Sequence, residues 1–132
     1  MSRSGYSDDC ENVQLWRGAV RSAIRGKRGQ KFLREMLDAL DAMPDKRLIT
    51  DDLVNDGEVC AIGSVGIARS LRMDDLDPLY PHMIARRFGI AEALVQEIEY
   101  VNDEAGRKAD SPYSRWCRVR AWVSAQIKEP KP

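Results

Sequence analysis

The residues best suited to chemistry form a row of basic side chains near the start of the chain. Arg17, Arg21 and Arg25 recur at intervals of four residues, and Lys27 and Arg28 follow them directly. Guanidinium and ammonium groups bind phosphates and carboxylates through charge-assisted hydrogen bonds. The spacing therefore predicts a surface of five basic residues that binds an anionic partner.

The element that must position this row is an amphipathic helix over residues 12–27. Val13, Trp16, Val20 and Ile24 recur at helical spacing and predict a buried stripe, with the arginines to one side of it. We expect the glycines at 26 and 29 to end this helix in a left-handed cap, with the two following cations near its negative end. A phosphate-binding loop at 26–29 is disfavoured, because the spacing and the Lys-Ser/Thr ending of that motif are missing.

Three interpretations of the basic row stay open. The chain carries 21 basic and 21 acidic residues, but charge is segregated, with only basic charges from 17 to 34 and mostly acidic ones from 38 to 58. The row could bind a protein, bind nucleic acid, or be a solvated face that pairs with the chain's own acids at 38–58. The zero net charge favours a protein over nucleic acid, because nucleic-acid binders usually carry a basic excess.

Other residue types that could do chemistry form no recognisable constellation. His82 is the only histidine and lacks a nucleophile beside it, so we expect a structural role. The three cysteines have neither metal-ligand nor disulfide spacing, and we expect free thiols. Five acids are expected on the solvated side of one helix rather than in catalysis: Glu92, Glu97, Glu99, Asp103 and Glu104. We therefore predict a non-enzymatic protein with no catalytic site, no metal and no cofactor.

Hydrophobic periodicity predicts an all-α fold, a compact single-domain bundle of five to seven short helices. After the first helix we expect helices over 30–43, 51–55, 58–71, 80–88, 90–104 and 112–127, with a strand at 59–62 as an alternative. Pro44, Gly89 and Ser111-Pro112 mark helix boundaries. Residues 1–11 should form a flexible N-terminal arm, 12–127 a single helical domain, and 128–132 a disordered tail.

Targeting signals are not evident in the sequence. The first residues lack the apolar stretch of a signal peptide, and no run approaches the roughly 18 apolar residues of a membrane span. These observations predict a cytoplasmic protein that does not interact with a membrane.

Several segments resemble small uncharacterised proteins encoded by tailed phages and prophages. They are residues 16–30 (WRGAVRSAIRGKRGQ), 57–66 (GEVCAIGSVG), 88–91, 102–104 and 115–116. The resemblance covers about residues 5–127 and brings no catalytic residues. It implies an accessory protein in a bacterial host cytoplasm that binds a host or phage protein, with inhibition of a defence complex among the implied roles.

Overall fold

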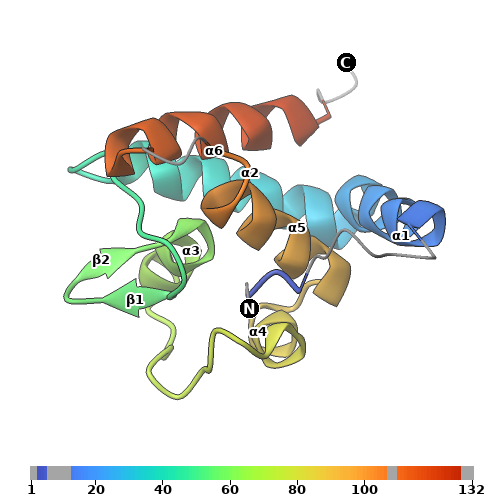
Figure 1. Ribbon diagram of the computed structural model, residues 1–132, viewed down its shortest axis with the longest axis horizontal. Helices are drawn as coiled ribbons and strands as arrows, with labels where there is room; N and C mark the ends of the chain where they lie inside the picture. The colour runs from blue at the N-terminus through green and yellow to red at the C-terminus, as the bar shows by residue number, and fades with distance from the viewer. Residues whose placement is uncertain (1–2, 6–12, 107–109, 129–132) are drawn as a thin grey trace.

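The computed structural model describes residues 3–5, 13–106 and 110–128, and the fold over these ranges is mostly helical, as predicted. The described residues form six helices and one small hairpin, arranged as in Figure 1. The elements are α1 (Val13–Arg25), α2 (Lys27–Ala42), β1 (Val54–Asn55), β2 (Glu58–Val59), α3 (Ala61–Ala68), α4 (Pro81–Phe88), α5 (Glu92–Asp103) and α6 (Pro112–Gln126).

The two longest helices, α2 and α6, lie side by side across the molecule (Figure 1). Helix α3 packs against α2 and α5, and α5 also contacts α4 and α6. Helix α1 lies at one end of the molecule, against α2 and α5, and the hairpin lies at the other end (Figure 1). The core between them is apolar, and its most deeply buried side chains include Phe32, Leu33, Met36, Leu40, Ile62, Ile84, Leu94 and Ile98.

The corner between α1 and α2 differs from the predicted left-handed cap. Gly26 adopts an extended conformation (φ −66°, ψ 161°) and is the N-cap of α2, which begins at Lys27. Gly29 is helical, and a side chain there would overlap the carbonyl oxygen of Ala23 on α1. The glycine at 29 is therefore needed for close approach of two helices, and Lys27 and Arg28 lie in the first turn of α2 rather than beyond a helix end.

The predicted helix at 51–55 was wrong, and the predicted helix at 58–71 is shorter than expected. Val54 pairs with Val59 and Asn55 with Glu58 in an antiparallel hairpin. Its turn residues, Asp56 and Gly57, both have positive φ, the backbone that a tight two-residue hairpin requires. Helix α3 follows at Ala61, so the strand alternative is correct only for Val59. The Asn-Asp-Gly turn signal outweighed the helical periodicity around it.

The boundary signals at Pro44, Gly89 and Ser111 agree with the structure. Helix α2 ends at Ala42, Gly89 caps α4 in the left-handed conformation with φ 73°, and the Ser111 side chain accepts a hydrogen bond from Ser114 N at the start of α6. Local backbone chemistry fixes these ends, so the sequence alone could predict them.

One buried side chain, Gln30, joins α1, α2 and the end of α6. Its Nε2 donates to the carbonyl oxygens of Ile24 (2.7 Å) and Gln126 (3.0 Å). Its Oε1 accepts from the backbone N of Lys128 (2.8 Å). Lys128 Nζ in turn donates to the carbonyl oxygen of Arg25. These bonds hold the α1–α2 corner against the C-terminal helix.

The described part of the predicted N-terminal arm packs into the molecule. Arg3 and Ser4 are 3% and 0% exposed, and Figure 1 shows this short stretch, in dark blue, in the middle of the molecule. The prediction of a flexible arm therefore does not describe residues 3–5. Its other residues, and all of the predicted tail except Lys128, lie outside the described ranges.

Candidate functional site

Four of the five predicted binding residues are exposed together at the α1–α2 corner. Arg21 and Arg25 lie one turn apart on α1, and Lys27 and Arg28 open α2. Lys31, one turn further along α2, is exposed beside them. We call Arg21, Arg25, Lys27, Arg28 and Lys31 the basic corner. Over the described ranges, none of these five side chains forms a hydrogen bond or an ion pair.

The fifth predicted residue, Arg17, has a different environment. Its Nη1 and Nη2 donate to the two carboxylate oxygens of Glu97 on α5, at 3.1 and 3.4 Å. The Glu97 side chain is buried, whereas that of Arg17 is half exposed. This pair fastens α1 to α5, so we assign Arg17 to the fold and leave it out of the basic corner.

The acids at 38–58 do not neutralise the basic corner. Asp41 pairs with Arg120 on α6, and Glu58 pairs with Arg47 beside the hairpin. Among the residues that the structure describes, no acid of this segment pairs with the corner. In the described residues, therefore, no ion pair supports the interpretation that the basic row is neutralised by the acids at 38–58.

The backbone at the corner adds to the positive charge. The first turn of α2 has free N–H groups, its N-cap Gly26 provides no side-chain acceptor, and no acidic residue lies in that turn. Lys27 and Arg28 thus lie at the positive end of the helix dipole, where a positive charge is unfavourable. An anion placed there would interact favourably with both the dipole and the side chains.

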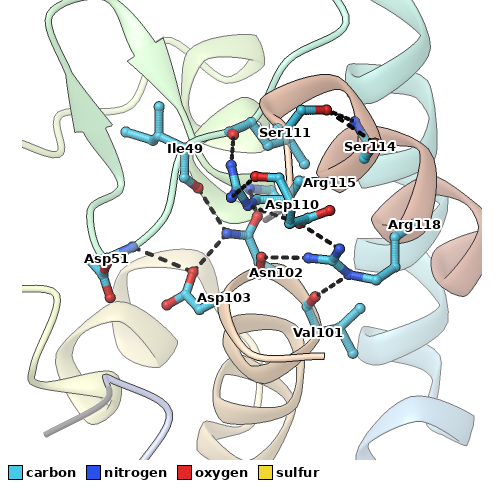
Figure 2. Close-up of polar contacts among 12 residues, drawn as sticks. Ile49, Asp51, Val101, Asn102, Asp103, Asp110, Ser111, Ser114, Arg115 and Arg118 are labelled. Carbon is cyan, nitrogen blue, oxygen red and sulfur yellow. Dashed lines mark hydrogen bonds and ion pairs between the residues drawn. The ribbon is translucent and has the colours of Figure 1, made fainter. Parts of the chain in front are cut away.

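A second polar cluster lies where α5 ends and α6 begins (Figure 2). Arg118 donates to the carbonyl oxygens of Val101 and Asn102 and to Asp110 Oδ2 (2.6 Å). The buried Asn102 side chain accepts from Ala61 N (3.0 Å) and donates to the carbonyl oxygen of Ile49 (2.9 Å). These bonds satisfy helix ends and loop carbonyls, so the cluster joins α3, α5, α6 and the segment before the hairpin.

Next to Asn102 lies a buried pocket that holds the side chain of Arg3. The Arg3 guanidinium donates from Nε and Nη2 to the two carboxylate oxygens of Asp103, at 2.5 and 2.8 Å. Its Nη1 lies 3.6 Å from Cys60 Sγ, at the N-cap of α3. Ser4 Oγ donates to Glu104, which follows α5. We call the site formed by Cys60, Glu99, Asp103 and Glu104 the Arg3 pocket.

Glu99 is the least satisfied member of the Arg3 pocket. It is fully buried, and Arg3 Nε lies 3.5 Å from its Oε2. Neither carboxylate oxygen of Glu99 has a hydrogen-bond partner in the described part of the chain. Burial raises the pKa of Glu99 to about 8, although the charge of Arg3 opposes the rise. Near neutral pH its protonated form is therefore favoured.

Sequence reasoning missed the Arg3 pocket. Glu97 and Glu99 were expected on a solvated helix face, but both are buried, because α1 covers Glu97 and the N-terminal segment covers Glu99. The helical spacing of Glu99 gave no sign of this, since its partner Arg3 lies about a hundred residues away in the chain. One sequence feature could have indicated a buried polar site: the polar residues Asn102 and Asp103 come directly after Val101, which was expected to face the core.

The remaining candidates carry little chemistry. His82 is exposed and contacts the ring of Tyr80. A cavity of about 400 Å³ between α2, α3 and the hairpin is lined mainly by Ala39, Met43, Val59 and Ile67, with the Arg47–Glu58 pair among its lining residues. In the described residues no group of three or more His, Cys, Asp or Glu side chains could hold a metal ion. None of the helices searched there is long and apolar enough to cross a membrane.

The chain was compared with protein-family models, with curated proteins and with solved structures, and none of the three comparisons finds a match.

Proposed function

We propose that this protein binds an acidic protein partner through the basic corner and acts by binding rather than by catalysis. The observation that carries the proposal is that five cations gather at one exposed corner and that none of them forms an ion pair with an acid of the described chain. The acid that interacts electrostatically with the corner is Glu35, one turn after Lys31, and its carboxylate pairs with Arg69 instead. Like charges held together on a folded surface repel one another, and a carboxylate-rich partner surface would relieve that repulsion.

The rigidity of the corner supports this role. The Gln30 and Lys128 side chains bond the carbonyl oxygens of Ile24 and Arg25, directly before Gly26, and the Lys128 backbone N bonds the Gln30 side chain, so the five cations are presented from a fixed scaffold. A preorganised surface binds more tightly because less side-chain and loop entropy is lost on association. We further propose that the partner is a bacterial host protein, an extension that rests on the resemblance to phage-encoded proteins alone.

The first test is a tagged pull-down from bacterial lysate, with and without nuclease treatment. We expect a protein partner that survives nuclease and is lost when Arg21 and Arg25 are both changed to glutamate. The matched control is the double variant Arg72→Glu/Arg86→Glu, which makes the same change in net charge on other exposed residues. Binding that persists in the corner variant, or that is lost equally in the control, would overturn the assignment.

Nucleic acid is the second candidate, because the helix end and the guanidinium groups suit phosphates as well as carboxylates. It makes a distinct prediction. For B-DNA, the logarithm of the binding constant should fall by about 0.9 per phosphate contact for each tenfold rise in salt. Recovery of nucleic acid, with loss of every captured protein after nuclease treatment, would replace the protein partner by this alternative.

A further inference from the structure

We propose that the Arg3 pocket is a peptide-binding site that recognises the sequence Arg-Ser-Gly, and that the chain's own N-terminal segment occupies it. The site is separate from the basic corner: it lies between the start of α3 and the end of α5, and its charge is acidic. A ligand would be a peptide segment that carries an arginine and replaces residues 3–5.

Arginine is the side chain that the pocket selects. Asp103 accepts two parallel hydrogen bonds from Nε and Nη2, a geometry that a planar guanidinium provides and a lysine ammonium does not. The third nitrogen, Nη1, reaches Cys60 Sγ. All three nitrogens of the guanidinium therefore have a contact within the pocket.

The two following residues are recognised as well. Ser4 is fully buried, and its hydroxyl donates to the Glu104 carboxylate. Gly5 has φ +75°, a left-handed backbone that disfavours residues with a side chain, and an added Cβ would lie 3.2 Å from Gln96 Nε2. The pocket thus contacts the side chains at two consecutive positions, and the backbone conformation at the third, which is exposed, favours glycine.

The pocket has a strong requirement for a cation because of Asp103. The Asp103 side chain is buried, and a buried carboxylate left without a partner is strongly destabilising. Arg3 directs its hydrogen bonds to Asp103 and leaves both oxygens of Glu99 without one. Because a three-residue segment supplies the cation, a peptide of the same sequence can compete for the site once Arg3 is removed.

The test uses the full chain with Arg3→Ala, and two synthetic peptides, MSRSGY and MSKSGY, titrated by calorimetry. We expect one MSRSGY peptide per chain, with affinity on the order of tenfold higher than that of the lysine peptide. The unaltered chain should bind MSRSGY more weakly, because its own segment competes at an effective concentration in about the millimolar range. Adding Asp103→Asn to the variant should abolish the preference for arginine.

Three results would overturn the proposal: a folded Arg3→Ala chain that does not bind MSRSGY, equal binding of both peptides, or equal affinity in the variant and the unaltered chain. If Arg3→Ala prevents folding, the same peptides are added and helicity is followed by circular dichroism. Recovery of helicity with MSRSGY but not with MSKSGY would support the site, and failure of MSRSGY to restore it would overturn it.

Discussion

At the scale of single residues, the burial of Glu99 has the clearest consequence for the stability of the protein. Most acids with shifted pKa values in this chain are stabilised as carboxylates by an arginine, such as Glu35 by Arg69 and Asp75 by Arg87. Glu99 is the opposite case, because burial raises its pKa to about 8. Its environment in the folded protein favours the proton.

This shift predicts a pH dependence of the free energy of unfolding. Because the pKa of Glu99 is higher in the folded state, its contribution is fully present below the unfolded value of 4.5 and is lost as pH rises toward 8. The charged groups facing Glu99 are Arg3, Asp103 and Glu104. Urea unfolding at several pH values should show stability falling over this window by a few kcal/mol, at roughly 1.4 kcal/mol per unit of pKa shift.

The variant Glu99→Gln should remove most of that decline, because it keeps the shape of the side chain and loses its titration. The control is Glu92→Gln on the same helix, whose side chain is exposed and which should leave the slope unchanged. An equal slope in the unaltered chain and in Glu99→Gln would show that the decline has another source.

At the scale of elements, α1 and α2 each carry a glycine, Gly18 on α1 and Gly29 on α2, and the two have opposite roles. Gly29 lies so close to α1 that an added Cβ would overlap the Ala23 carbonyl oxygen, whereas Gly18 has nothing within 4 Å. Both are helical in the structure. The difference between them is therefore one of tertiary contact rather than of backbone conformation.

We expect Gly29→Ala to destabilise the protein by about 1–3 kcal/mol, because backbone atoms must move to admit the methyl group. Gly18→Ala should stabilise it by roughly 0.5–1 kcal/mol, since alanine favours a helix and the space is open. Thermal unfolding of the two variants provides the comparison. A Gly29→Ala protein as stable as Gly18→Ala would contradict the close approach of α1 and α2.

At the scale of the whole molecule, Gln30 connects the proposed binding surface to the C-terminal helix. Its three hydrogen bonds reach the end of α1 and the end of α6, elements that are far apart in the sequence. The basic corner is therefore positioned by the whole fold rather than by one helix. A change that leaves every charge in place can still disturb it.

We predict that Gln30→Ala costs about 1–3 kcal/mol of stability, because it leaves buried backbone groups without partners. It should also weaken capture of the partner, although the variant retains all five cations of the corner. The control is Gln126→Ala, since the structure uses only the backbone carbonyl of that residue in this contact. Unchanged partner capture by a folded Gln30→Ala chain would show that the corner does not depend on this connection.

The sequence by itself predicted the features that depend on local backbone chemistry. Helical periodicity gave the all-α fold and five of the helices close to their observed limits, and Pro44, Gly89 and Ser111 marked ends that the structure shows. The error at 51–55 was also local, because the Asn55-Asp56-Gly57 sequence at the end of that segment favours a tight turn, which the structure uses in a hairpin. The basic residues were likewise visible in the sequence, since charge is a property of residue type.

Only the tertiary structure decided which charges are free and which are paired. It separated Arg17, bonded to Glu97, from the exposed Arg21 and Arg25 on the same helix. It also placed Arg3 beside Asp103, at a separation of 100 residues. The physical reason is that pairing depends on distance and burial in space, and neither follows from helical spacing when the partner belongs to another part of the chain.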